Sequence, residues 1–176
     1  MKTLFKVILL LVALCFAPSL ALAQPPDDSA TCDVTVTVDA IMEWSAASYA
    51  DIALAAITSQ TDTPWGSRDF ILYTNCNSEI SADNTATAQL SSATDTLVTE
   101  YQLAFDGGGV TATGGTDIGA WTDFSTFLSP ASAVTHVDGD GTAVITLSAR
   151  ASTGGTVPDQ GNYSATQTLT AAWTSN

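Results

Sequence analysis

The chain has 176 residues, and its 18 acidic residues against 4 basic ones give a formal charge of −14 at pH 7. Lys2 and Lys6 lie in the first 23 residues, so the rest keeps Arg68 and Arg150 against all 18 acidic residues, a formal charge of −16. Nucleic acids and anionic membrane surfaces bind clusters of Lys and Arg, so this balance argues against both as partners. Solubility is the simplest role for the acidity, and binding of divalent cations or a salty habitat is the alternative.

The first residues, MKTLFKVILLLVALCFAPSLALA, have the pattern of a secretory signal peptide over residues 1–23. Two lysines precede an apolar run from Val7 to Phe16, and Ala21 and Ala23 predict cleavage before Gln24. The run is much shorter than the roughly 20 residues of a membrane-spanning helix, and no later segment is a better candidate. We therefore expect a secreted protein, extracellular, on the cell surface or periplasmic, with no membrane span after cleavage.

After the signal peptide we expect a short lead and one domain. Residues 24–31, QPPDDSAT, are rich in Pro and Asp and lack apolar periodicity, which predicts a flexible lead. Residues 32–176 have the size of one ordinary domain. We expect no second domain.

The domain begins with two segments of strand-like pattern. CDVTVTVDAIMEW at 32–44 alternates apolar and polar residues from Val34 to Val38, which predicts a strand with one buried face and a bulge near Ala40. YADIALAAITS at 49–59 fits either a strand or a short helix, and we favour a strand.

After a turn at residues 64–66, further apolar runs predict the centre of a sheet. RDFILYTNC at 68–76 is continuously apolar and rich in β-formers, which is typical of a central strand covered on both faces. TATAQLSS at 85–92 and TEYQLAFDGGG at 99–109 have the pattern of successive antiparallel strands.

The last third is expected to add a loop and two strands. Residues 114–130 keep near-helical aromatic spacing, but their Thr, Ser and Gly weaken a helix and predict a long loop that caps the core. TAVITLSAR at 142–150 and YSATQTLTAAW at 163–173 are predicted strands, separated by a loop at 151–162. We expect the final strand to complete the sheet, with Leu169 in the core.

Seven to eight strands and few credible helices predict an all-β fold. The interpretation is an immunoglobulin-like or Greek-key antiparallel β-sandwich. Cys15 is lost with the signal peptide, and Cys32 and Cys76 are then left as an isolated pair in an exported chain, so we expect one disulfide between them. Two free thiols are the alternative; two cysteines and one distant histidine are too few ligands for a zinc site.

The stretch HVDGDGT at 136–142 is the one that most resembles a ligand site. Asp138 and Asp140 alternate with glycines near His136, as in part of an acidic calcium loop. A third spaced acid and a downstream bidentate Glu are missing, and a tight turn explains Asp-Gly without a ligand. A turn is the preferred interpretation, with weak calcium binding by Asp138 and Asp140 as the alternative and no other cofactor expected.

The sequence assigns no catalytic residue. His136 is the only histidine, and there is no G-x-S-x-G nucleophile elbow. Carboxylate pairs are abundant, but their spacing selects none for glycoside hydrolysis. We therefore expect a protein that is not an enzyme.

Tryptophans offer a second way to bind a ligand. Most of the four are expected in the core, but Trp65 lies in a turn beside Pro64 and Gly66 and is the candidate for exposure and ligand contact, for instance with a sugar ring. Asn162 begins N-Y-S, which fits the N-glycosylation pattern.

The signal peptide, TCDVTVTV near the mature start, ILYTNC ending a strand with the second cysteine, and the terminal QGNYSATQTLTAAW occur together in this chain. This arrangement resembles the spore-coat-U-like secreted domains of bacteria, a group that includes archaic chaperone-usher pilins. In the pilins, an N-terminal segment of alternating apolar residues completes a neighbour's sandwich by strand addition. Here residues 24–31 hold two prolines and no large apolar residue, so we expect a self-complete domain or a subunit that joins others differently.

The resemblance and the absence of a catalytic pattern together predict a secreted, non-enzymatic surface or extracellular structural protein, such as a fibre, coat or pilus-like subunit. Its partners would be copies of itself or other surface subunits. The runner-up is a carbohydrate- or ligand-binding sandwich module that uses tryptophans or calcium, and an esterase or glycosidase comes third.

Overall fold

The structure, a computed structural model, describes residues 28–176. A compact unit spans Val38–Asn176. The predicted signal peptide and the first half of the predicted lead, residues 24–27, lie outside the described residues. In the part of the chain that is described, no helix has the length and apolarity needed to cross a membrane.

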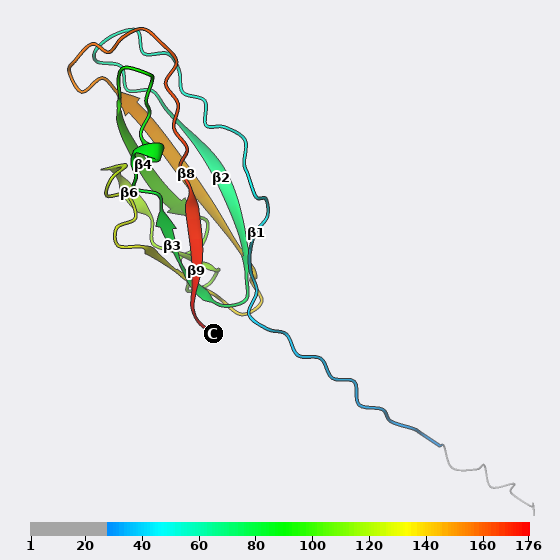
Figure 1. The fold of residues 1–176 in the computed structure, drawn as a ribbon. Helices are drawn as coiled ribbons and strands as arrows, with labels where there is room; N and C mark the ends of the chain where they lie inside the picture. The colour runs from blue at the N-terminus through cyan, green and yellow to red at the C-terminus, as the bar shows by residue number, and fades with distance from the viewer. Residues whose placement is uncertain (1–27) are drawn as a thin grey trace, which may run out of the picture. The chain divides into compact units, whose positions relative to one another are not determined.

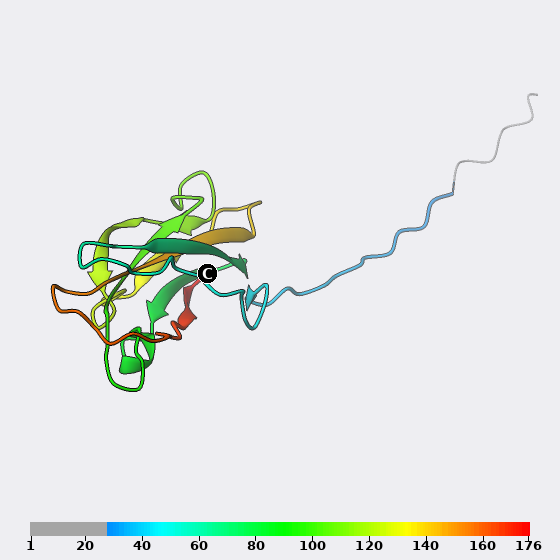
Figure 2. The same ribbon diagram turned by 90° about the horizontal axis from the view of Figure 1, so that it is seen from above.

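The compact unit consists of two antiparallel sheets, which confirms the all-β, sandwich-like architecture (Figure 1). Viewed from above, the two sheets form two layers (Figure 2). The five-stranded sheet has the order β1 (Met42–Trp44), β2 (Trp65–Thr74), β8 (Thr142–Ser152), β4 (Val98–Phe105) and β6 (Ile118–Asp123). The four-stranded sheet has the order β5 (Gly114–Gly115), β7 (Ser132–Thr135), β3 (Asn77–Ala82) and β9 (Leu169–Ser175). The helical element of the described residues is a single 3₁₀ turn, η1 (Ala86–Ala88).

The central strand β8 shows most clearly how the core forms. Its residues alternate strictly between buried and half-buried positions, because successive side chains of a strand point to opposite faces. Ala143, Ile145 and Leu147 face the second sheet and are at most 2% exposed. The strands β2 and β4 flank β8 and add Leu72 and Leu103 to the same inner layer.

The strand predicted at 32–44 is present only as Met42–Trp44. Val34, Val36 and Val38 are 91%, 86% and 68% exposed, so the prediction of a buried face is wrong here. Alternation identifies a sequence that suits a strand with one apolar side, but it does not show which partner covers that side.

Two further predicted strands are absent. Residues 49–59 form no strand, and Ile52 and Leu54 pack against Gly66 of β2 as irregular chain. Residues 85–92 contain the 3₁₀ turn η1 instead of a strand, because the Thr85 side chain accepts a hydrogen bond from the Thr87 N–H and caps the turn.

Residues 68–76 were predicted to form a strand covered on both faces; the strand is present, but the burial of both faces is wrong. The strand β2 covers most of that range, yet Leu72 is fully buried while Tyr73 is 45% exposed, so only one face of the strand is covered. The predicted loop at 114–130 holds β5 and β6. Its later part does fill the core, because Phe127 is fully buried with its ring centroid 5.4 Å from that of Tyr101.

The final strand begins at Leu169 and not at the predicted Tyr163. It pairs with β3 and forms one edge of the four-stranded sheet. Leu169 is 8% exposed, as expected for a core residue, whereas Trp173 is 55% exposed. Among residues 28–176, one side of the β9 backbone has no strand partner, as is usual for an edge strand of an open sheet, so the completed sheet stays a prediction.

Candidate functional site

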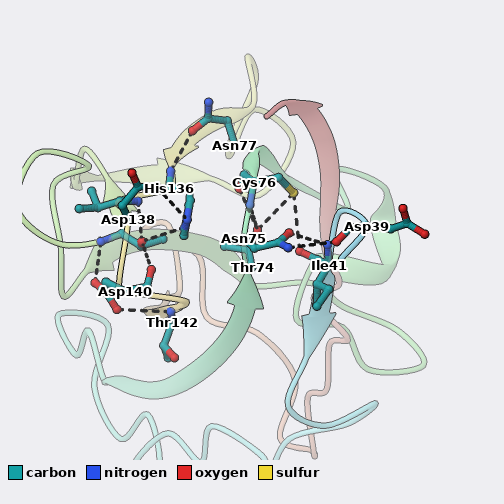
Figure 3. Close-up of polar contacts among 12 residues, drawn as sticks. Asp39, Ile41, Thr74, Asn75, Cys76, Asn77, His136, Asp138, Asp140 and Thr142 are labelled. Atoms are coloured by element: carbon teal, nitrogen blue, oxygen red, sulfur yellow. Dashed lines mark hydrogen bonds and ion pairs between the residues drawn. The ribbon is translucent and has the colours of Figure 1, made fainter. Parts of the chain in front are cut away.

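Hydrogen bonds with Asn75 fix the chain just before β1 (Figure 3). The Ile41 N–H donates to Asn75 Oδ1 at 2.6 Å, and Asn75 Nδ2 donates to the Asp39 carbonyl at 3.0 Å. The Asn75 N–H also donates to the Ile41 carbonyl at 3.2 Å. Three hydrogen bonds from one residue thus hold Asp39 and Ile41, and the exposed valines lie immediately N-terminal to this point.

The two cysteines within residues 28–176, Cys32 and Cys76, are free thiols in the structure. Cys76 is 1% exposed, and its Sγ lies 3.4 Å from Thr74 Oγ1 and 3.6 Å from the Ile41 carbonyl oxygen (Figure 3). Cys32 lies in the exposed segment. A disulfide needs the two Cα atoms within about 7 Å, so residues 32–38 would have to lie against the start of β3. The expected bridge is not formed here and stays a prediction for the oxidised protein.

The Asp-Gly stretch forms a tight turn. Val137 and Asp140 pair as an isolated antiparallel bridge, and Gly139 has a φ of 84°, a conformation that favours glycine. The Asp138 side chain is exposed and its Oδ1 lies 4.0 Å from His136 Nε2. Asp140 is bonded into the fold, because its Oδ2 accepts the Thr113 N–H at 2.7 Å.

Asp138 and Asp140, the two aspartates of the calcium hypothesis, have different surroundings. Asp140 supports the packing of Thr113 against the turn, while Asp138 lies in solvent. Over residues 28–176, no three His, Cys, Asp or Glu side chains form a metal-binding group. Calcium binding at Asp138 and Asp140 stays a prediction.

The perturbed titrating groups are structural. Burial, with the negative charge of Asp83 as a second cause, raises the pKa of Tyr101 to about 12. The Tyr101 hydroxyl donates to the Ala88 carbonyl at 2.6 Å, inside the core. Hydrogen bonds from Thr58 lower the pKa of the exposed Asp62 carboxyl. Neither group lies in a cleft, so neither points to acid–base chemistry.

A shallow depression of about 300 Å³ lies on the outer face of the five-stranded sheet, the face turned away from the second sheet. Register places its centre, because Trp65 of β2 pairs with Arg150 of β8 and Arg150 pairs with Glu100 of β4. Directly paired residues share one face of a sheet, so these three side chains form a row across three strands. The depression is lined by Thr63, Trp65, Gln102, Trp121 and Arg150.

Two polar side chains of the depression, Arg150 and Gln102, are held in place by neighbouring groups. Arg150 Nε donates to Glu100 Oε2 at 2.7 Å, and its guanidinium carbon lies 4.8 Å from the centroid of the Trp121 ring. Gln102 Nε2 donates to the Gly119 carbonyl at 2.6 Å. The β4 and β6 pairing shifts register beside Gln102, which places the extra residues of β6, including Trp121, opposite that side chain.

Of the residues that line this depression, the sequence predicted a ligand contact only for Trp65. Trp65 is 64% exposed, which the turn at 64–66 anticipated. Alternation within β4 and β8 would have placed Glu100 and Arg150 on the outer face, but the pairing of strands far apart in the sequence carries no local signal.

Comparison with known proteins does not add a site. No model of a known protein family matches this chain, and no curated protein matches it.

Proposed function

We propose that this chain is a secreted, non-enzymatic surface or extracellular structural protein, a fibre, coat or pilus-like subunit that joins copies of itself by strand addition. The observation that carries the proposal is the row of exposed valines at 34, 36 and 38. Residues 28–40 contain no helix or strand. An extended segment with one apolar side is the usual ligand for the open edge of a sheet.

The strand β9 offers an edge that such a segment would fit. One side of β9 pairs with β3, and the other has no strand partner in the described part of the chain. Burial along its inner positions falls from Leu169, at 8% exposed, to Trp173, at 55%. A second strand beside β9 would satisfy its free N–H and C=O groups and would cover Trp173 with valine side chains.

Three features of the sequence support the same class of function. The predicted signal peptide would direct export, and the acidity would keep a repetitive surface soluble. The spore-coat-U-like domains that the chain resembles include pilins, which polymerise. On this proposal, the connections between the two sheets are immunoglobulin-like, of Greek-key type. The resemblance placed the joining segment before Cys32, whereas the exposed valines lie after it.

The pairing of Cys32 and Cys76 would show whether the segment with the exposed valines stays with its own domain or joins a neighbouring molecule. A bridge between Cys32 and Cys76 of one molecule would tie the segment to its own domain, and a bridge between molecules would tie it to a neighbour. Peptide mapping of the secreted protein without reductant distinguishes these outcomes, because an intermolecular bridge also gives a ladder of covalent oligomers.

The direct test replaces all three valines by aspartate in the mature chain and compares assembly by light scattering and electron microscopy. We expect ordered oligomers from the wild type and monomers from Val34→Asp/Val36→Asp/Val38→Asp, because charges on the inserted side would be buried without partners. A free peptide of residues 31–41 should raise the melting temperature of this variant by occupying the vacant edge.

Val110→Asp/Val157→Asp is the matched control, because these valines are 83% and 70% exposed but lie outside the segment. The control should assemble as the wild type does. A wild-type chain that stays monomeric at every concentration, or a peptide that leaves the melting curve unchanged, would contradict strand addition.

A further inference from the structure

We propose that the depression on the outer face of the five-stranded sheet binds a neutral oligosaccharide, with Trp65 as the stacking platform. The site uses β2, β4, β6 and β8 and shares no residue with the exposed valines. This inference therefore goes beyond the assembly function and does not rest on it.

Trp65 supplies the apolar surface. Its side chain is 64% exposed on the outer face of the sheet, where a large ring in contact with water is unfavourable. A pyranose ring carries C–H groups on its faces and hydroxyl groups around its rim. One face of a sugar therefore covers an indole ring while its hydroxyls stay available for hydrogen bonds at the side.

Arg150 supplies donors that are already positioned. Its Nε is engaged by Glu100 at 2.7 Å, and its guanidinium lies over the Trp121 ring at 4.8 Å. Within residues 28–176, its terminal nitrogens donate to no protein acceptor. A side chain held on two sides loses little entropy when a ligand arrives, so its free N–H groups are well suited to sugar hydroxyls.

Gln102 supplies an acceptor next to these donors. The Gln102 amide nitrogen donates to the Gly119 carbonyl at 2.6 Å, which fixes the side chain and leaves its Oε1 to accept. A sugar hydroxyl both donates and accepts, and a site that alternates the two kinds of group matches it.

The charges select a neutral ligand. The one cation of the depression, Arg150, is balanced by Glu100 at contact distance. The chain after residue 23 carries a formal charge of −16, which repels anionic polymers on approach. A cationic ligand would meet the Arg150 guanidinium at the centre of the site.

The dimensions indicate more than one sugar. Trp65 and Trp121 belong to β2 and β6, which are three strand spacings apart in the sheet order. Neighbouring strands lie roughly 4.8 Å apart, so β2 and β6 are roughly 14 Å apart across the sheet, while the Trp121 ring reaches the Arg150 guanidinium beside Trp65. The volume of about 300 Å³ is at the lower end of small-ligand sites, which run from roughly 300 to 1,000 Å³. A short linear oligosaccharide lying across the strands fits these dimensions.

The test titrates the mature protein with neutral hexasaccharides of glucose, of mannose and of galactose, and with a hexamer of galacturonic acid as the anionic comparison. Tryptophan fluorescence and calorimetry report binding. We expect saturable binding of at least one neutral hexasaccharide in the micromolar to millimolar range and weaker binding of the anionic hexamer. Trp65→Ala should weaken the binding at least tenfold without lowering the melting temperature, because the side chain is exposed.

Tyr73→Ala is the matched control, since it removes an exposed aromatic ring, 45% exposed, from the same strand β2 but outside the depression. It should leave the affinity unchanged, whereas Gln102→Leu, which keeps the side-chain volume, should weaken it. The proposal is overturned if no neutral hexasaccharide saturates the protein, if Trp65→Ala binds as the wild type does, or if the anionic hexamer binds more tightly. Oligomer formation by Trp65→Ala is measured in parallel, so a failure of this inference is distinguishable from a failure of strand addition.

Discussion

At the scale of single residues, Tyr101 links the strand β4 to the turn η1. Its ring lies in the core and packs near Phe127, and its hydroxyl donates to the Ala88 carbonyl. The core around it excludes water from this hydrogen bond, since Ala88 is fully buried and Tyr101 is 3% exposed. An unmade bond at this position would leave a buried carbonyl without a partner.

We predict that Tyr101→Phe lowers the free energy of unfolding by about 1–3 kcal/mol, measured by urea denaturation. Tyr73→Phe, at a position that is 45% exposed, should change it little. A loss equal to that of Tyr73→Phe would show that the Ala88 carbonyl finds another donor.

The pH dependence gives a second measure of the same group. The folded pKa of Tyr101, raised to about 12, lies above the unfolded value of about 10. Its contribution to stability is therefore fully present below pH about 10 and is lost as the pH rises toward 12. We predict a flatter loss of stability for Tyr101→Phe than for the wild type in this window.

A third prediction at this scale concerns Asp138 and Asp140. If they bind calcium in the folded state only, millimolar calcium should raise the melting temperature relative to a chelator, and Asp138→Asn should remove the difference. Identical curves in calcium and chelator would leave the Asp-Gly stretch as a turn.

At the scale of elements, β9 shows how much one strand contributes although it lies at an edge. Leu169 reaches the core, and the strand pairs with β3 from Asn77 to Ala82. Removing it would expose both the inner layer and a second open edge on β3.

We predict that a chain ending at Gly161 aggregates or is proteolysed, and that Leu169→Ala costs about 2–5 kcal/mol of unfolding free energy. Thr170→Ala, at an exposed position on the same strand, is the control and should cost little. A soluble, cooperatively folding chain without β9 would show that the other eight strands are a sufficient fold.

The elements that sequence patterns predicted are the long ones with several apolar residues. The strands β2, β4 and β8 each run for 8 to 11 residues and place large apolar side chains on the inner face. The strands β3 and β7 were not predicted, because their buried positions include serines, Ser78 and Ser132, and short strands with small inner residues give a weak alternation. The exposed valines show the opposite error, in which a clear alternation was assigned to a buried face.

The candidate site could be predicted only in part for a related reason. The turn beside Trp65 indicated exposure, and the structure has that side chain exposed. Arg150 and Trp121 line the depression together with Trp65. They lie 85 and 56 residues further along the chain, on other strands. The strand order brings these residues together, and no local sequence pattern encodes that order.

At the scale of the whole molecule, the order of the strands separates two surfaces. The depression lies on the outer face of the five-stranded sheet, while β9 is an edge of the other sheet. A subunit that used β9 for assembly would therefore leave the depression of every copy uncovered by that contact, so a fibre would present the site repeatedly. Binding of a polymeric sugar would then gain from multivalency without any change in the single site.

On the proposed export, the place of β8 between β2 and β4 would also set the order in which the sheets form. Its partners precede it by roughly 80 and 45 positions in the chain, and β9 pairs with β3 over a still longer separation. Sheets built from distant segments fold slowly, because large loops must close, at a cost in entropy, before strand pairing contributes stabilising free energy. A chain that leaves the cell N-terminus first would expose its valine segment from the beginning and could not close either sheet until the last third had emerged. The interval in which the unfolded chain needs protection from premature association is thus a property of the strand order itself.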